Sequence, residues 1–414
     1  MNVGRDATDE AGAAGRSSDL VSPLAGPAGP FAAVPDGASD PRDPRRRPQR
    51  LPALDGLRGV AALVVVAFHV LLLAPTFAER DQTPSGVRVE EASWWLTHTP
   101  LYALWAGPQA VYLFFVLSGF VLTLPALAGG VRWRTYYPQR LLRLYLPVWG
   151  SLLLAVVLAA AVPRVPRPAL SGWYDAHIPV QGAAAVLRDG LLVLGTDWIN
   201  SPLWSLRWEV LFSLLLPLYL LAALRLRRLW VLKALLLLVM IAVGDRAFVG
   251  ELVHLPMFGL GVLLAVEGDR VAAAVARLAG TRARLLLLTG LCVALLTVEA
   301  GLLLVGLEWG PVRAAALVLT VVGACLAVVL ALHSPGARRI LGAPWVQWVG
   351  VRSFSLYLVH EPIAVSSGVL WPQLPIPGRL GIVLLVSLLV AHGFHRVVEV
   401  PAQRLSRAVA RIAT

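Results

Sequence analysis

Three ionisable residues lie within one apolar stretch near the start of the chain. Residues 51–73 read LPALDGLRGVAALVVVAFHVLLL and contain Asp55, Arg58 and His69. This composition predicts a membrane-spanning helix, in which ionisable groups are costly and mark a site that faces the protein interior. Arg58 and His69 are eleven positions apart, so they share nearly one helix face and lie about 16 Å apart along its axis. Asp55 is spaced to pair with Arg58. The structural alternative is a tilted first helix with a snorkelling arginine and a hydrogen-bonded histidine.

Two later apolar stretches place carboxylates and imidazoles at a depth similar to that of His69. Glu209 is expected about 8 to 9 Å inside the outer boundary of its span. Tyr357, His360 and Glu361 fall near the middle of another span. These groups predict a general-base site in which a carboxylate orients an imidazole or stabilises its charge. Structural alternatives are a bond from Glu209 to its own helix start and a packing role for His360 and Glu361.

A pair of arginines lies at one helix end on the predicted cytoplasmic side. Arg140 and Arg143 are three positions apart and therefore share one helix face. Paired guanidinium groups match phosphates well, which predicts a site for a phosphate-bearing donor. The alternative is the ordinary positive charge of a cytoplasmic helix end.

The composition is that of a membrane protein. Of the 414 residues, 57% are hydrophobic and only 14% are charged, against about 25% charged residues in soluble domains. The net charge of +12 does not indicate nucleic acid, because the basic residues lie between apolar segments. Cys292 and Cys325 both fall in predicted spans and give no disulfide or metal-ligand spacing. We therefore expect a lipid bilayer as partner, no nucleic acid and no metal.

The order of apolar and charged segments predicts an all-α, polytopic transmembrane helix bundle with about ten spans. Arginines gather in alternate loops, which predicts that both termini are cytoplasmic. We expect residues 1–50 to form a disordered basic cytoplasmic tail, residues 51–405 the transmembrane domain and residues 406–414 a short cytoplasmic tail. The apolar segment 183–195 is too short and too charged for a span and predicts an interfacial or re-entrant helix. The expected spans are 53–75, 104–126, 144–163, 203–223, 229–244, 252–267, 285–306, 312–332, 347–371 and 380–398.

Six stretches, in this order, resemble the motifs of the bacterial membrane acyltransferase-3 family. Together they cover the chain from about residue 52 to residue 405. They are LDGLRGVAALVVVAFH (54–69), LFFVLSGFVL (113–122), RLLRLYLP (140–147), WSLRWEVLFSLLLPL (204–218), GVRSFSLYLVHEP (350–362) and VEVPAQRL (398–405). The chain departs from the family pattern at Tyr112, where an Asp is frequent, and at Val210 and Ser213.

The resemblance implies transfer of an acyl group, commonly acetyl from acetyl-CoA, to a hydroxyl of a carbohydrate-containing acceptor. Such acceptors include cell-envelope glycans, glycolipids and glycosylated natural products, and the expected location is the bacterial inner membrane. By the same resemblance, Arg58 and His69 are the catalytic pair, Glu209 is the site acid, and Arg140 and Arg143 contact the CoA phosphates. The residues expected to support the site are Asp55, Tyr357, His360 and Glu361.

The residues also allow other functions. A transporter or flippase for a lipid-linked sugar or anion would use the buried arginine and histidine to line its path. A membrane scaffold is a third alternative, which the buried charges disfavour. The sequence leaves open the acceptor and its membrane face, the acyl chain and the oligomeric state. It also leaves open whether His69 is a general base or a transient acyl carrier.

Overall fold

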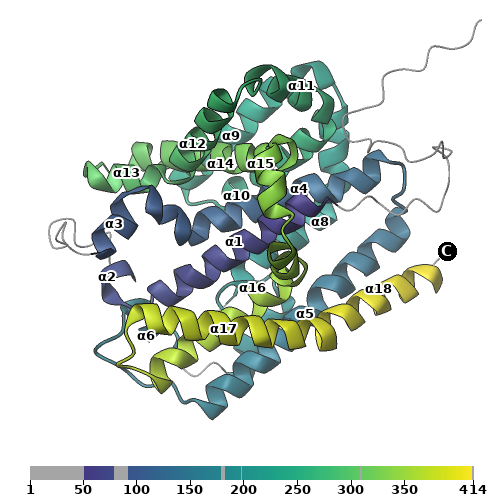
Figure 1. Ribbon diagram of the computed structural model, residues 1–414. Helices are drawn as coiled ribbons and strands as arrows, with labels where there is room; N and C mark the ends of the chain where they lie inside the picture. The colour runs from purple at the N-terminus through teal and green to yellow at the C-terminus, as the bar shows by residue number, and fades with distance from the viewer. Residues whose placement is uncertain (1–50, 79–91, 179–181, 197, 308–309, 413–414) are drawn as a thin grey trace, which may run out of the picture. The chain divides into compact units, whose positions relative to one another are not determined.

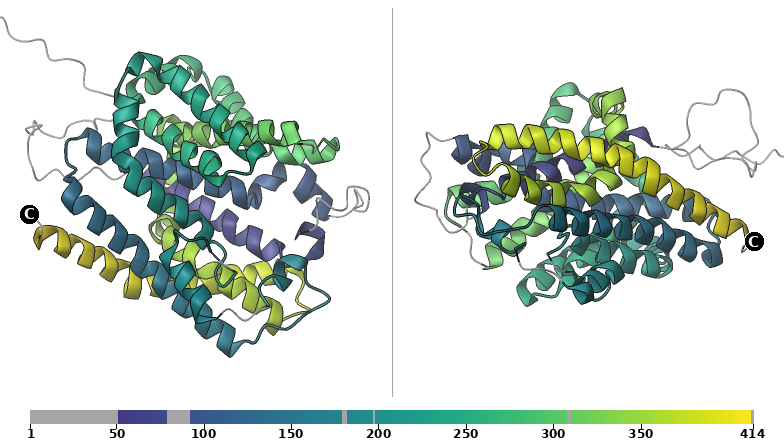
Figure 2. Two further views of the ribbon diagram at one scale, coloured as in Figure 1. Left: turned by 180° about the vertical axis from the view of Figure 1, so that it is seen from behind. Right: turned by 90° about the horizontal axis from the view of Figure 1, so that it is seen from below.

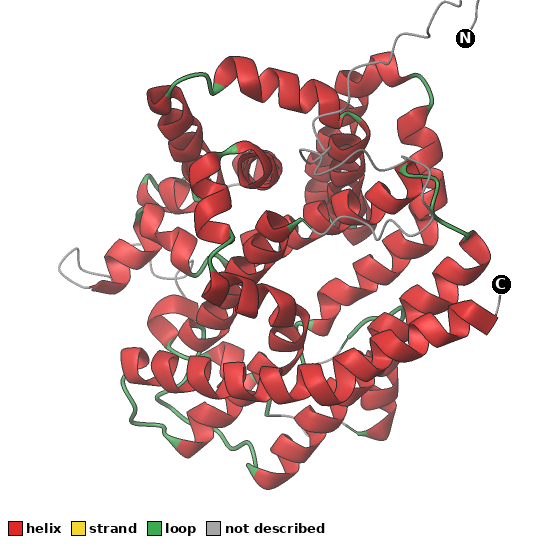
Figure 3. Ribbon diagram, turned by 45° about the vertical axis from the view of Figure 1, so that its right-hand side comes forward, coloured by secondary structure: helices red, strands yellow, loops and turns green. Residues whose placement is uncertain are grey.

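The computed structural model describes residues 51–78, 92–178, 182–196, 198–307 and 310–412. Every regular element in these ranges is a helix, as the ribbon diagrams show (Figures 1, 2 and 3). The predicted all-α class is therefore confirmed for the described residues. The predicted N-terminal tail, residues 1–50, lies outside them.

Six helical runs among the described residues are long and apolar enough to cross a membrane, or up to seven if a bent pair counts as one span. The chain is therefore a multi-pass membrane protein, but the predicted count of about ten spans is not confirmed. The six runs are α1 (Pro52–Leu71), α4 (Gly107–Leu127), α5 (Trp133–Ala161), α8 (Leu203–Leu224), α14 (Gly310–His333) and the continuous run Ile376–Val409, which begins with α17 (Ile376–Phe394).

The other expected spans are not both long and apolar enough to count as membrane-crossing helices, each for its own reason. Helix α10 (Gly250–Val266) is apolar but has only 17 residues. Helices α11 (Gly268–Leu278) and α12 (Arg282–Leu296) meet at a bend of 119° and form the possible seventh span. Helix α9 (Trp230–Ala247) carries charged residues at both ends, and α16 (Pro344–Leu370) is long but rich in polar side chains.

The remaining elements are short. The segment predicted as an interfacial or re-entrant helix contains α7 (Ala183–Leu191), whose nine residues cannot span a bilayer. The other short helices are α2 (Pro75–Ala78), α3 (Ala92–His98), η1 (Pro100–Leu104), α6 (Gly172–Asp175), η2 (Arg227–Leu229), α13 (Val298–Leu304) and α15 (Pro335–Leu341).

Helix α1 packs along α16 through glycines (Figure 1). A Cβ atom on Gly59 would lie 2.7 Å from the amide nitrogen of Gly350, and one on Gly350 would lie 2.2 Å from the carbonyl oxygen of Asp55. Small residues at such an interface allow two helix backbones to approach closely. This contact brings the ionisable residues of α1 against the polar residues of α16.

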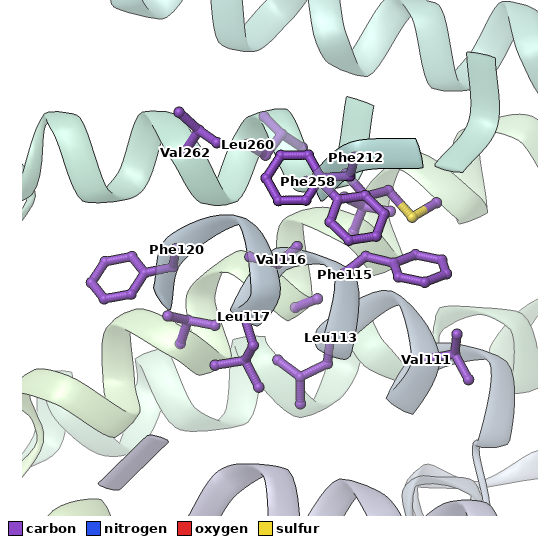
Figure 4. Packing of buried hydrophobic residues seen from close by; sticks show 14 of the residues in the cluster. Val111, Leu113, Phe115, Val116, Leu117, Phe120, Phe212, Phe258, Leu260 and Val262 are labelled. Carbon is purple, nitrogen blue, oxygen red and sulfur yellow. The ribbon is translucent and has the colours of Figure 1, made fainter. Parts of the chain in front are cut away.

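Helix α4 is fixed by α8 and α10 through aromatic packing. The Phe258 ring stacks on Phe115 at 4.7 Å and on Phe212 at 4.5 Å between ring centroids, as Figure 4 shows. All three rings are buried. Because burying one such side chain stabilises a fold by about 1.5–3 kcal/mol, this cluster holds Ser118 of α4 beside Glu209 of α8.

Helix α17 continues into α18 (Val400–Ile412) through a π-helical turn, η3 (His395–Glu399). Helix α18 packs against α5, and the left view of Figure 2 shows the two side by side. This helix therefore runs well beyond residue 398, where the sequence predicted the end of the last span.

Replacement of Gly350 by alanine tests the contact between α1 and α16. The added Cβ has no space against the backbone of α1, so Gly350→Ala should destabilise the purified protein by about 1–3 kcal/mol. The measurement is the melting temperature in detergent. Gly381→Ala is the matched control, because nothing lies within 4 Å of a Cβ at that position in α17. Equal melting temperatures for the two variants would contradict the close contact.

Candidate functional site

A cavity of about 400 Å³ lies among α1, α4, α5, α8, α16 and the junction of α17 with α18. It brings together five residues that the sequence singled out on three separate helices. The charged and polar residues that line it are Asp55, Arg58, Ser118, Arg140, Arg143, Glu209, Ser353, His395, Glu399 and Gln403.

One of the three arginines is already neutralised. Arg140 Nη2 forms an ion pair with Glu209, and both side chains are mostly buried. The same guanidinium donates from Nε to Ser213 Oγ at 3.1 Å, and Ser118 Oγ donates to Glu209 at 3.3 Å. Glu209 therefore bonds to neighbouring helices and lines the cavity with Arg58, whereas His69 does not line it.

The other two arginines keep their charge available. Neither Arg58 nor Arg143 makes a hydrogen bond or an ion pair with any residue that the structure describes, so the expected pair between Asp55 and Arg58 is not formed. Both line the cavity. Two guanidinium groups that no carboxylate bonds directly, at one cavity, favour a phosphate-bearing ligand.

A second, much smaller cavity, which we call the neck, adjoins this one along α16. Its volume is about 30 Å³, and it shares Arg58, Ser118 and Glu209 with the larger cavity. In its lining Tyr357 Oη lies 2.7 Å from Ser205 Oγ. The Tyr357 ring is in turn 5.9 Å from that of His360, although neither His360 nor His69 lines the neck.

His69 and His360 form a buried pair in direct contact, with 3.1 Å between His69 Nδ1 and His360 Nε2. His69 Nδ1 also lies 2.9 Å from the Val65 carbonyl oxygen, and His360 Nδ1 lies 3.1 Å from that of Leu356. A carbonyl only accepts, so each Nδ1 carries a hydrogen. In the neutral ring, His69 Nε2 then keeps its lone pair. His360 Nε2, whose own Nδ1 carries the hydrogen, can accept from His69 Nδ1.

Glu361 serves a different histidine. Its Oε1 lies 2.7 Å from His177 Nε2, and its Oε2 accepts from the backbone amide of Ser201 at 3.0 Å. His177 Nδ1 lies 2.8 Å from the carbonyl oxygen of Trp173. Both nitrogens of His177 thus face oxygen atoms, an arrangement that suits an ion pair between its imidazolium form and the Glu361 carboxylate. The expectation that Glu361 directly orients the catalytic imidazole does not fit this geometry.

Sequence reasoning missed His177, because it lies outside every apolar span. Its segment is tied to the end of α1, where Ser171 bonds to the carbonyl oxygens of Leu72 and Leu73. Arg164 donates to the His177 carbonyl oxygen at 3.0 Å, and burial lowers the pKa of this guanidinium. The Trp173 ring lies 4.4 Å from that of His177 and 5.6 Å from that of His69.

The sequence also matches known proteins. The profile of a family described as an acyltransferase domain, acyltransferase-3, matches residues 51–394. Acyltransferase MdmB of Streptomyces mycarofaciens is 30% identical over 184 residues, which are 44% of this chain and 42% of MdmB. The chain thus aligns with less than half of the length of that relative. No solved structure matches the chain.

Replacements at the His177–Glu361 pair test the buried charge. Glu361→Gln leaves an imidazolium without its counter-charge, and the loss of one partner of a buried pair costs about 3–5 kcal/mol. The double variant His177→Gln with Glu361→Gln has no charge to compensate, so its melting temperature in detergent should lie above that of Glu361→Gln. Additive losses in a double-mutant cycle would show that the two groups are not paired.

Proposed function

The chain belongs to the acyltransferase-3 family and is an acyltransferase, and we propose that it moves an acyl group from acyl-CoA to a hydroxyl of a carbohydrate-containing acceptor. We propose acetyl as the acyl group and acetyl-CoA as the donor. The acceptor would be a cell-envelope glycan, a glycolipid or a glycosylated natural product, modified at the bacterial inner membrane. Membership of the family favours this function over the transporter or flippase alternative.

The donor site is the cavity lined by Arg58 and Arg143, neither of which is hydrogen-bonded or ion-paired to a described residue. This observation carries the proposal, because a CoA thioester presents several phosphates at one end and its reactive carbonyl at the other. Arg58 and Arg143 bind the phosphates. Arg140 contributes to the site while it is ion-paired with Glu209. The predicted acid, Glu209, would therefore act as the counter-charge of Arg140.

His69 is the general base of the transfer. The acceptor oxygen attacks the thioester carbonyl carbon while its proton passes to His69 Nε2. A C–O bond forms, the C–S bond breaks, and the proton returns from His69 to the leaving thiolate of CoA. His360 Nε2 accepts the hydrogen bond from His69 Nδ1 and so stabilises the imidazolium that forms in between.

The position of the two sites sets one further requirement. Arg58 and His69 are about 16 Å apart along α1, so the pantetheine arm of the donor must extend through the neck. The neck holds about 30 Å³ and is lined by Phe114 and Phe354, so these side chains must move when the arm enters.

Loss of the imidazole tests the base. His69→Ala should lower acyl transfer from labelled acyl-CoA in membranes by at least about 100-fold, the usual effect of a missing general base. His254→Ala is the control, because that histidine is packed against Trp204 and Trp208 in another part of the bundle. Normal transfer by a folded His69→Ala protein would rule out this role.

The two arginines of the motif should respond differently to replacement. Arg143 has no hydrogen-bond or ion-pair partner among the described residues, so Arg143→Ala should raise the apparent KM for acyl-CoA about tenfold, more than that for the acceptor, and leave the melting temperature nearly unchanged. Arg140→Ala also removes the partner of Glu209 and should lower the melting temperature. If Arg143→Ala raised the KM for the acceptor more than that for acyl-CoA, Arg143 would instead supply the ordinary positive charge of a cytoplasmic helix end.

A further inference from the structure

We propose that the π turn between α17 and α18 is a binding wall for the nucleotide end of the acyl donor, through His395 and Gln403. This inference rests on the proposed function and adds two ligand-binding residues to it. Both line the large cavity, and both lie beyond residue 394, where the match to the family profile ends.

The π turn sets the direction of the side chains that follow it. A π turn adds one residue to a helical turn and is frequent at functional sites. Here it occupies His395–Glu399 and lets Glu399 reach Ser355 of α16, whose Oγ lies 2.5 Å from the carboxylate. Gln403, one helical turn further on, also faces the cavity.

Glu399 fixes the two proposed ligand-binding side chains. This carboxylate is 6% exposed and accepts from His395 Nδ1 at 2.9 Å and from Gln403 Nε2 at 3.0 Å. A buried carboxylate needs such bonds, and in return it holds both donors in one orientation. His395 Nε2 and Gln403 Oε1 have no hydrogen-bond partner among the described residues, so each can bind a ligand.

The position of this wall indicates which part of the donor it contacts. His395, Glu399 and Gln403 line the large cavity with Arg58 and Arg143, but none of the three lines the neck. The group bound here is therefore remote from the reacting carbonyl. An adenosine phosphate fits the wall, because the Gln403 amide oxygen can accept from its exocyclic amino group, and His395 Nε2 can accept from a ribose hydroxyl or, with both ring nitrogens carrying hydrogen, donate to a phosphate.

Binding of two probes to the purified full-length chain in detergent tests this inference. The probes are coenzyme A and adenosine 3′,5′-bisphosphate, which is the nucleotide end without the pantetheine arm. His395→Ala should raise the Kd of both probes by a similar factor of about ten, measured by isothermal titration calorimetry. Gln403→Ala, a second variant on α18, should act in the same direction if His395→Ala does not fold.

The matched control is His392→Ala. This histidine lies on the same helix but accepts from Arg352 at 2.8 Å, stacks on Trp348 and does not line the cavity. Its replacement should leave both Kd values unchanged. If folded His395→Ala and Gln403→Ala bind both probes like the wild type, or weaken coenzyme A alone, the proposed wall is wrong. If the wild type binds no coenzyme A, the proposed function itself fails.

Discussion

The cost of a charge in hydrocarbon is the constraint on which this structure depends. An ionisable side chain within a transmembrane bundle must be paired or face a polar cavity, and both solutions occur here. Glu209 is paired with Arg140, and Glu361 with His177, each from a different part of the chain. Because these pairs join distant segments, they also fix which helices are neighbours.

The charges that remain unpaired define the site. Arg58 and Arg143 line the cavity without a hydrogen bond or ion pair to any described residue, whereas Glu209 in the same cavity is bound to Arg140. A cavity in which every arginine had its own acid would bind phosphates poorly, since a ligand would have to displace each acid. The Arg140–Glu209 pair therefore has two effects. It links α5 to α8, and it leaves the guanidinium groups of Arg58 and Arg143 without a bond to Glu209, so that they can bind a phosphate.

The relative positions of the candidate site residues could be predicted from the sequence where those residues lie on one helix. The helical period places Arg58 and His69 on one face, and the charge spacing marked Arg140 and Arg143. The sequence was insufficient where contacts cross between helices, as for Arg140 with Glu209. Adjacent residues on a helix point about 100° apart, so His360 faces His69 whereas Glu361 faces His177. The expected count of about ten spans is not confirmed, because among the described residues six helical runs, or seven with the bent pair of α11 and α12, are long and apolar enough to cross a membrane.

The histidine pair bears on whether His69 acts as a base or carries the acyl group. Its Nδ1 hydrogen is directed at the Val65 carbonyl and at His360, so only Nε2 is available for either role. An acyl group on Nε2 would leave the ring cationic unless Nδ1 lost its hydrogen, and His360 Nε2 lies where it could take that hydrogen. In the base mechanism, His360 instead stabilises a proton that His69 returns to the thiolate. The two mechanisms thus differ in the proton transfers at His360. Because His360 contacts His69, either mechanism would involve both histidines and not His69 alone.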